Sequence, residues 1–348
     1  MTTATHRPAY VLPLRHDRDA DLAELTAYLR WLSGRAEVVV VDGSAPRWFE
    51  RHRRAWGDLV VHVRPDPELR CANGKVAGVI TGVCLVRAER VIIADDDVRY
   101  DGDALAAVAG ALDGADLVVP QNYFRPTPWH CRWDTARSLL NRAFAHDYPG
   151  TLAVRRTAFH RFGCYDGDVL FENLELIRTV RARGGTVQYL LSPLVRRLPP
   201  DVRTFLSQRV RQAYDSFAQP WRLAAELAIL PAAVAAARRG GRLVAGGLVA
   251  AALLAEAGRR RAGAAAVYPA DSALWVPLWL AERGVCSWLA VGTRVLRGGV
   301  SYRDGRLRVA AHSAAQLRDR VKVTGVKARR AGWGRPSSRA PARTRSAG

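Results

Sequence analysis

Short runs of apolar, mostly β-branched residues alternate with helical segments in the first third of the chain, and this alternation constrains the fold most. Residues 38–41 are four valines and residues 91–94 read Val-Ile-Ile-Ala, while further strands are predicted over 9–15, 59–63 and 117–120. Helices are predicted over about 19–33 and 73–87. Strands alternating with helices form a mostly parallel sheet covered on both faces. The sequence therefore predicts an α/β fold, although it contains neither a glycine-rich dinucleotide fingerprint nor a phosphate-binding loop.

Three consecutive acids, Asp95, Asp96 and Asp97, close the apolar run 91–94. Open α/β sheets bind their ligands outside the carboxyl ends of the strands. Two carboxylates spaced i, i+2 at such an end can hold a divalent ion that neutralises a diphosphate, so Asp95 and Asp97 are the predicted metal ligands. Asp96 is expected to point to the other side of the strand end. The alternative is a solvated acidic turn.

Charge and cysteine content limit the classes of partner and compartment. The chain has 348 residues, 53 Lys+Arg against 32 Asp+Glu, and a formal net charge of +21, which favours phosphate, nucleic acid or an anionic membrane as a partner. The basic residues are dispersed, and no nucleic-acid recognition motif is visible. Five scattered cysteines without a CxxC pair fit reduced cytosolic thiols. No apolar signal segment is found in the first eight residues.

The composition changes near residue 220 and predicts a second, apolar region. Two apolar runs of about 15 residues lie within 223–257, separated by the arginine-rich segment 238–242, and a third stretch over 273–296 is rich in Trp and Leu. Tryptophan suits the membrane interface, so membrane association is favoured over the alternative of an Ala-rich soluble hairpin. The predicted units are a catalytic domain over 1–220, a membrane-associated helical region over 221–297, a hairpin over 298–312 and a basic, largely disordered tail over 313–348.

Four elements in order resemble the inverting glycosyltransferases of family 2. They are Asp42 at the end of VVVVDGS, the segment Asn73-Gly74-Lys75, the Asp95-x-Asp97 pair, and Gln208-Arg209-Val210-Arg211-Gln212, which resembles the family's QxxRW motif with Gln212 in place of Trp. The resemblance implies a GT-A nucleotide-diphospho-sugar transferase domain, a nucleotide-sugar donor, and Mg²⁺ or Mn²⁺ on Asp95 and Asp97. It assigns donor binding to Pro13, Asp42, Lys75 and Asp96, and support of the diphosphate to Arg211 and Gln208.

Lys75 also has an argument of its own. Every other cation in the first 321 residues is an arginine, and a compact ammonium suits a phosphate or a crowded carboxylate. The alternative is a lysine on a helix surface.

The motif that carries the family's catalytic base is altered in this chain. Glu172 takes the place of the family's Glu, and Asn173 takes the place of its usual Asp. An amide cannot accept the proton of an attacking hydroxyl, so Glu172 is the predicted base, with Asp166 or Asp168 as alternatives. An impaired enzyme is a further alternative, as is a structural role for Glu172 through an ion pair such as one with Arg178.

The C-terminal region is similar to that of ceramide glucosyltransferase-like and hopanoid-pathway enzymes. The similarity rests on Leu274-Trp275-Val276-Pro277-Leu278-Trp279, on Ser287-Trp288-Leu289, and on the segment 299–308, where Tyr302 replaces a Trp and Asp304 is inserted. It implies a lipid or lipid-linked acceptor at the cytoplasmic membrane face. The rival functions are a basic nucleic-acid-binding protein, a catalytically impaired scaffold of the same fold, and a nucleotidyltransferase.

Overall fold

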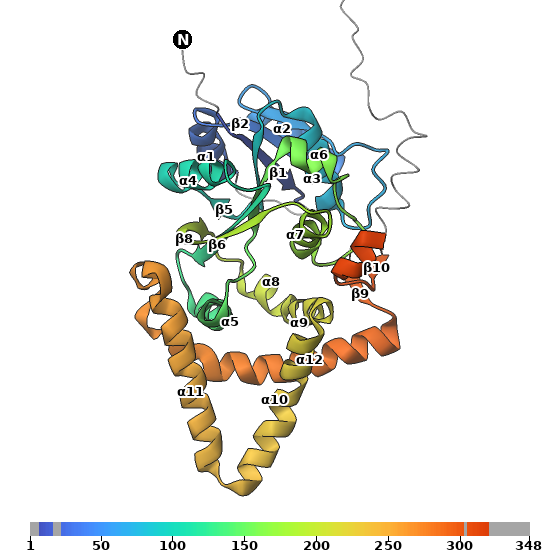
Figure 1. The fold of residues 1–348 in the computed structure, drawn as a ribbon. Helices are drawn as coiled ribbons and strands as arrows, with labels where there is room; N and C mark the ends of the chain where they lie inside the picture. The colour runs from blue at the N-terminus through green and yellow to red at the C-terminus, as the bar shows by residue number, and fades with distance from the viewer. Residues whose placement is uncertain (1–6, 17–21, 303–304, 320–348) are drawn as a thin grey trace, which may run out of the picture.

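A computed structural model describes residues 7–16, 22–302 and 305–319 of the protein. The predicted α/β fold is confirmed by an eight-stranded sheet with helices on both faces, followed by a region of apolar helices (Figure 1). The elements of the α/β half are β1 (Ala9–Leu14), α1 (Ala23–Ser33), β2 (Glu37–Asp42), α2 (Pro46–Trp56), β3 (Val61–Val63), α3 (Gly74–Leu85), β4 (Arg90–Ala94), β5 (Val98–Arg99), α4 (Gly102–Ala111), β6 (Leu117–Phe124), α5 (Trp129–Phe144), β7 (Thr151–Arg155), α6 (Arg156–Arg161), α7 (Glu172–Ala182), β8 (Val187–Arg197), α8 (Val202–Ser207), α9 (Arg209–Tyr214) and η1 (Asp215–Ala218).

The strands are ordered β3-β2-β1-β4-β7-β6-β8-β5. Strands β3, β2, β1 and β4 run parallel, as do β6 and β8, whereas β7 is antiparallel to both its neighbours and β5 is antiparallel to β8. The carboxyl ends of β1, β2 and β4 therefore lie at one edge, where Asp42 and the acids after Ala94 emerge. The sheet topology thus places two of the predicted site segments on the same edge.

The side chains of successive residues in the central strands are buried on opposite faces of the sheet. Tyr10, Leu12 and Val40 pack under α1 and α4, while Val11 and Val41 pack under α3 and α7. Local signals fix the helix starts beneath these faces: the Asn73 side chain accepts a hydrogen bond from the Lys75 amide at the start of α3, and Asp101 accepts one from the Ala104 amide at the start of α4. The first turn of α3 is thereby set beside the carboxyl end of β4.

The second half of the chain is a splayed helical hairpin crossed by a long helix (Figure 1). Its elements are α10 (Pro220–Arg239), α11 (Gly241–Arg260), η2 (Arg261–Ala266), η3 (Ala270–Trp275) and α12 (Val276–Arg297). Trp288 of α12 donates to the Leu227 carbonyl of α10 at 3.2 Å, and α11 meets α5 where Gly258 lies so close to the Leu139 carbonyl that a Cβ would overlap it. The hairpin is thus held to the α/β half at its base.

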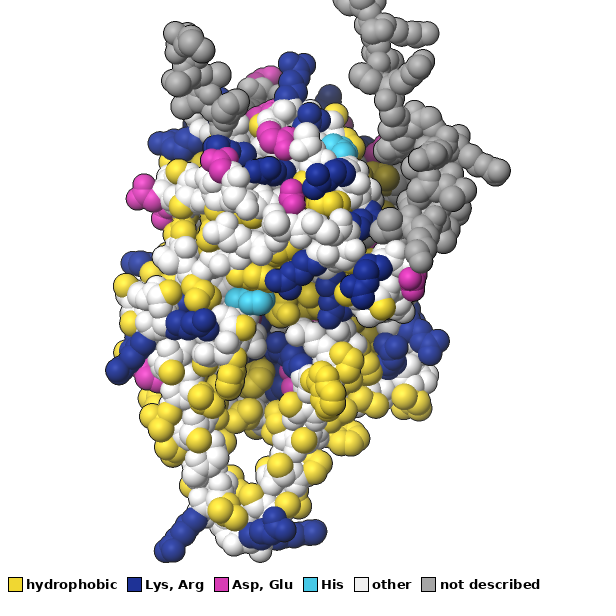
Figure 2. All heavy atoms as spheres, in the orientation of Figure 1, with side chains coloured by type: hydrophobic (Ala, Val, Ile, Leu, Met, Phe, Trp, Pro, Cys, Tyr) yellow, Lys and Arg dark blue, Asp and Glu magenta, His cyan; other side chains and the backbone are white. Residues whose placement is uncertain are grey.

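Apolar side chains cover the surface of the hairpin, and arginines gather at its tip (Figure 2). The segments Pro220–Arg239 and Gly241–Ala266 are long and apolar enough to cross a membrane, by length and composition. Each of the helices α10 and α11 has 20 residues, or about 30 Å of helix, which extends beyond the predicted apolar runs.

A short hairpin follows α12 and returns to the α/β half. It consists of β9 (Val300–Tyr302) and β10 (Gly305–Leu307). The Tyr302 hydroxyl donates to the side-chain Oδ1 of Asn73 at 2.8 Å, so the position where the resembled family carries Trp contacts the start of α3. Asp304, the predicted tail from 320 onward and residues 19–21 of the first predicted helix lie outside the described residues.

Candidate active site

The three acids after β4 separate into a pair and a single residue. Asp97 accepts a hydrogen bond from Arg197 Nε at 2.7 Å, and Asp95 lies 3.6 Å from Arg197 Nη2. Asp96 instead lies 3.3 Å from the Nε2 of His16. Asp95 and Asp97 therefore both contact the Arg197 guanidinium on one side of the strand end, while Asp96 contacts His16 in the segment that follows β1.

Lys75 joins the acid pair to the start of α7. Its ammonium forms an ion pair with Asp95 and contacts Glu172 Oε1 at 2.5 Å. Burial alone would raise the pKa of Glu172, but the charge and hydrogen bond of Lys75 outweigh it and hold the pKa below its ordinary value. Glu172 is therefore an ionised carboxylate beside the acid pair.

The other acids named as possible bases lie away from this group. Asp168 accepts a hydrogen bond from the Ala72 amide, and Asp166 accepts one from the Asp168 amide. The side-chain Nδ2 of Asn173 donates to the Pro149 carbonyl at 2.9 Å, and the Arg178 guanidinium donates to the backbone carbonyls of Ala218 and His312. The carboxylate among these candidates that contacts Lys75 is Glu172.

The acid pair meets a simple test for holding a cation. Asp97 Oδ1 is buried and has no hydrogen-bond partner among the described residues. Burial raises the pKa of Asp97 to about 6, with Arg197 opposing the rise and Asp95 adding to it. A Cβ at Gly150 would lie 2.8 Å from Asp95 Oδ2, so only glycine leaves this oxygen its present space. An unpartnered oxygen beside a second carboxylate is the donor set that Mg²⁺ or Mn²⁺ accepts.

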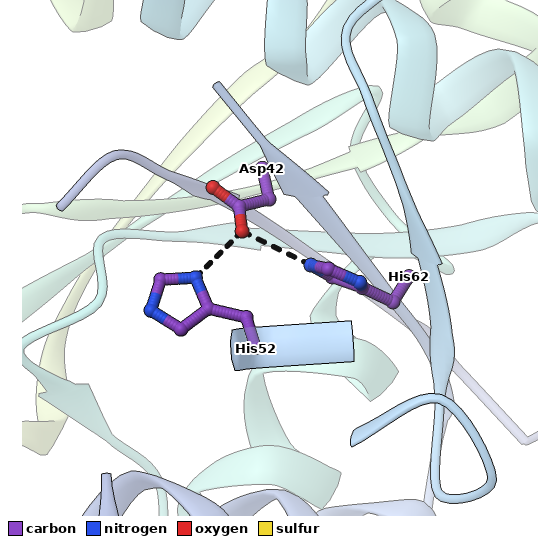
Figure 3. Close-up of side chains that lie close together, drawn as sticks. All are labelled: Asp42, His52 and His62. Carbon is purple, nitrogen blue, oxygen red and sulfur yellow. Dashed lines mark hydrogen bonds and ion pairs between the residues drawn. The ribbon is translucent and has the colours of Figure 1, made fainter. Parts of the chain in front are cut away.

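Asp42 is fully buried at the end of β2, and one of its carboxylate oxygens points toward two histidines (Figure 3). Its Oδ2 lies 2.6 Å from His52 Nδ1 and 3.0 Å from His62 Nε2, and its Oδ1 accepts from the Ser44 amide. Burial alone would raise the pKa of Asp42, but these hydrogen bonds hold it well below its ordinary range. A ligand at this strand end therefore meets the side chains around Asp42 before it meets the carboxylate.

The possible metal-ligand atoms of Asp42, His52 and His62 lie within 4.8 Å of one another, as do those of Asp166, Glu175 and His312. Members of each group are already hydrogen-bonded to one another: Asp42 contacts both histidines, and Glu175 accepts from the backbone amide of His312 at 2.7 Å. Their geometry is accounted for by these bonds.

The remaining predicted residues border the site at different distances. Pro13 lies in β1 and packs against Gly78 of α3. Gln208 lies at the junction of α8 and α9, and the Arg211 guanidinium lies 5.0 Å from the Tyr302 ring centroid. The Arg211 charge helps to lower the pKa of Glu172, after the larger effects of burial and Lys75. Among the predicted residues, direct contact unites Lys75, Asp95 and Glu172.

Arg197 is the main site residue that sequence reasoning does not find. It ends β8 and contacts both acids of the pair, although it lies 100 residues from Asp97 in sequence. In an arginine-rich chain a single arginine at a strand end carries no distinguishing local signal. His52 and His62 are missed in the same way, because their contact with Asp42 depends on the packing of α2 and β3.

Comparison with known proteins gives no relative in sequence and partial likenesses in structure. No family model matches the chain, and no curated protein matches it. A mannosyltransferase from Pyrobaculum calidifontis in complex with GDP-Man and Mn²⁺ is 18% identical, covers 84% of this chain and 87% of its own, and has a TM-score of 0.49.

Two further solved structures cover less of the chain. Glucosyl-3-phosphoglycerate synthase from Mycobacterium tuberculosis, in complex with Mn²⁺, UDP and phosphoglyceric acid, is 16% identical, covers 58% of this chain and 74% of its own, and has a TM-score of 0.40. Mannosyl-3-phosphoglycerate synthase from Rubrobacter xylanophilus is 18% identical, covers 58% and 69%, and has a TM-score of 0.39. At these values the chain is similar to glycosyltransferases of known structure and is assigned to no family.

Proposed function

We propose that the protein is a metal-dependent glycosyltransferase of the GT-A type that moves a sugar, with inversion, from a nucleotide-sugar donor to a lipid or lipid-linked acceptor. The observation that carries the proposal is the group of Asp95, Asp97 and Glu172 at the carboxyl end of β4, held by Lys75 and Arg197. Three carboxylates and two cations gathered at one strand end suit a charged leaving group better than a structural turn, for which a single capping acid is enough.

Asp95 and Asp97 would hold Mg²⁺ or Mn²⁺. The bound ion supplies positive charge that stabilises the diphosphate as it leaves. Arg211 offers a fixed pair of N–H donors to the same diphosphate, with Gln208 beside it. Lys75, Pro13 and Asp96 border the donor, and Asp42 acts at the nucleoside end by orienting His52 and His62, whose ring nitrogens it binds.

Glu172 is the proposed base. The acceptor oxygen forms a bond to the anomeric carbon, the bond from that carbon to the diphosphate breaks, and the hydroxyl proton passes to Glu172. A single displacement of this kind inverts the anomeric centre. Lys75 keeps Glu172 ionised before the reaction, which is the state a proton acceptor needs.

The acceptor and the location rest on the second half of the chain. The helices α10 and α11 expose apolar side chains along their length, and Trp221 at the start of α10 is 89% exposed. A surface of this kind is stable when it contacts lipid. We therefore place the protein at the cell membrane with the α/β half on the cytoplasmic side.

A catalytically impaired scaffold of the same fold is the second candidate, because the Asn173 side chain binds the Pro149 carbonyl where the family carries its base. If Asn173→Asp were required before any sugar transfer could be measured, the scaffold would be favoured. Transfer by the wild-type chain excludes it.

Metal-dependent donor binding tests the proposal directly. We expect the full-length protein in detergent to bind one member of a nucleoside-diphosphate panel in the presence of Mn²⁺, and Asp97→Ala to weaken that binding by about 100-fold or more. Asp103→Ala removes an exposed acid from α4 and serves as the matched control. Wild-type affinity in Asp97→Ala would overturn the metal assignment, and no binding by the wild type would overturn the function.

A further inference from the structure

A cavity of about 140 Å³ lies between the acid pair and the apolar helices. A single water needs only about 10–15 Å³, so the cavity has room for a polyatomic group. Its walls include residues of α5, β8, α9, η1, α10 and α12, and its charged lining consists of Arg137, Arg197, Asp215, Arg222 and Arg283. The cavity is therefore shared by the two halves of the molecule.

Arg197 connects this cavity to the active site. Its Nε donates to Asp97 at 2.7 Å, while its side chain also lines the cavity. On the opposite side Arg222 projects from α10, next to the exposed Trp221. A molecule held in the cavity would lie between the proposed transfer site and the lipid-facing helices, where an acceptor has to sit.

Three of the four arginines already have carboxylate partners. Arg137 lies 2.6 Å from Asp147, Arg197 is bound to Asp97, and Arg222 lies 3.0 Å from Glu226. Arg283 differs from them. It is 1% exposed, its Nε and Nη2 have no hydrogen-bond partner among the described residues, and its Nη2 lies 4.0 Å from the carboxylate of Glu282.

Acceptor and donor atoms on other walls are also unpartnered. Asp215 Oδ1, Gln212 Oε1 and Arg137 Nε are buried without a hydrogen bond among the described residues. Buried polar groups in folded proteins are almost always paired, so a cavity lined by several unpaired ones is built for a polar occupant. Water could pair with any of these atoms, but an oxyanion accepts hydrogen bonds from the unpartnered N–H groups of Arg283 and Arg137. It also brings a negative charge into direct contact with the Arg283 guanidinium, whose ion pair with Glu282 is as long as 4.0 Å.

Building on the proposed function, we propose that the cavity binds a phosphate group carried by the acceptor, so that the substrate is a phosphorylated molecule and not a neutral one. The unpartnered N–H groups of Arg283 donate to two of the phosphate oxygens, and the unpartnered Nε of Arg137 donates to a third. Gln212 Oε1 in α9 and Asp215 Oδ1 in η1 are hydrogen-bond acceptors, and hydroxyl groups of the phosphorylated substrate would donate to them. Phosphate in this position leaves the acid pair and Lys75 free to handle the donor.

Binding of inorganic phosphate gives the first test. Full-length protein is saturated with Mn²⁺ and its nucleoside diphosphate, so that the donor site is filled, and is then titrated with inorganic phosphate by calorimetry. We expect Arg283→Gln to weaken phosphate binding at least 10-fold while the nucleotide affinity stays within twofold of wild type. Arg297→Gln removes an exposed charge from the same helix and is the matched control.

Arg283→Lys keeps the charge without the fork and guards against a folding defect in Arg283→Gln; we expect it to bind phosphate with intermediate affinity. Equal phosphate binding by wild type and Arg283→Gln, or no phosphate binding by a wild type that binds nucleotide, would overturn the cavity assignment alone. Absence of nucleotide binding in the wild type would instead overturn the proposed function.

Transfer assays identify the source of the phosphate. Phosphatidylcholine vesicles carry either lysophosphatidic acid, which has both a phosphate and a free hydroxyl, or the matching monoacylglycerol, and parallel reactions contain glycerol 3-phosphate or glycerol. We expect sugar transfer to the phosphorylated member of one pair, with the acylated pair indicating a lipid acceptor and the glycerol pair a soluble one. Transfer to the alcohols at an equal rate would contradict the proposal.

Discussion

The sheet and the helical hairpin treat their apolar side chains in opposite ways. In the α/β half, the valines and leucines of β1, β2 and β4 are buried under helices on both faces, whereas on α10 and α11 leucines and valines point outward. The first half obtains its stability from its own interior. The second half exposes apolar side chains that the α/β half would bury, and under the proposed function this difference divides the molecule into a part that performs the chemistry and a part that holds it at the membrane.

The largest expected effect is on the free energy of unfolding, and one matched Leu→Ala substitution in each region tests it. Leu12 in β1 is 0% exposed, and Leu253 in α11 is 65% exposed. We expect Leu12→Ala to lower the free energy of unfolding by about 2–5 kcal/mol through lost burial and a residual cavity, and Leu253→Ala to change it by less than about 0.5 kcal/mol. Denaturant unfolding of the full-length protein in detergent measures both. Similar losses in the two variants would show that the hairpin is packed like the sheet.

For membrane partition we expect substitutions in the hairpin to have a larger effect than substitutions in the α/β half. Val249→Ser/Leu253→Ser removes two exposed apolar side chains from α11, and Val61→Ser/Leu85→Ser removes two exposed ones from the α/β half. The first pair loses about 3 kcal/mol of transfer free energy to lipid, or roughly 100-fold in partition, while the second pair loses little. Cell-free synthesis with phosphatidylcholine vesicles, followed by flotation, reports the bound fraction. Equal flotation of the two double variants would contradict a lipid-facing hairpin.

The same contrast explains which parts of the fold follow from local sequence. The valine run of β2 and the acids that follow Ala94 are local patterns, so the strand, the strand end and the division of Asp96 from its neighbours were accessible. The apolar composition of 223–257 likewise predicts helices that associate with a membrane. Helices α2 and α4 are not among the predicted elements, because the first is dominated by charged residues and the second is short and alanine-rich.

Contacts across the fold could not be read in this way. Lys75 stands out as a lone lysine, but its bridge to Glu172 spans 97 residues and exists because α3 and α7 cover the same face of the sheet. The predicted alternative of an ion pair between Glu172 and Arg178 is wrong, since Arg178 donates to backbone carbonyls. Which of many arginines contacts Asp97 depends on the position of β8, and no local pattern encodes it.

The smallest expected effect tests the boundary between the two regions through pH. Asp215 lies in η1 where the α/β half meets α10 and α12, and burial raises its pKa to about 7, with Arg211 opposing the rise and Glu172 adding to it. The unfolded chain releases this proton near pH 3.8, but the folded chain keeps it until about pH 7. Folding therefore takes up a proton between these values, and the stability contributed by the neutral carboxyl declines as the pH rises through this window.

Asp215→Asn has no proton to lose, so its advantage over wild type should grow with pH. We expect little difference at pH 4 and a gain on the order of 1–2 kcal/mol at pH 8 in phosphate-free buffer, measured by thermal unfolding in detergent. This is less than the roughly 4 kcal/mol that the full pKa shift would give, because water and nearby arginines rearrange around the ionised carboxylate. Asp103→Asn, which changes an exposed acid, should shift the melting temperature by the same small amount at both pH values. A difference between Asp215→Asn and wild type that is constant from pH 4 to pH 8 would mean that the Asp215 carboxyl is not held neutral at the junction. The cavity beside it would then already carry a compensating negative charge, and the junction between the two regions would not favour an added anion.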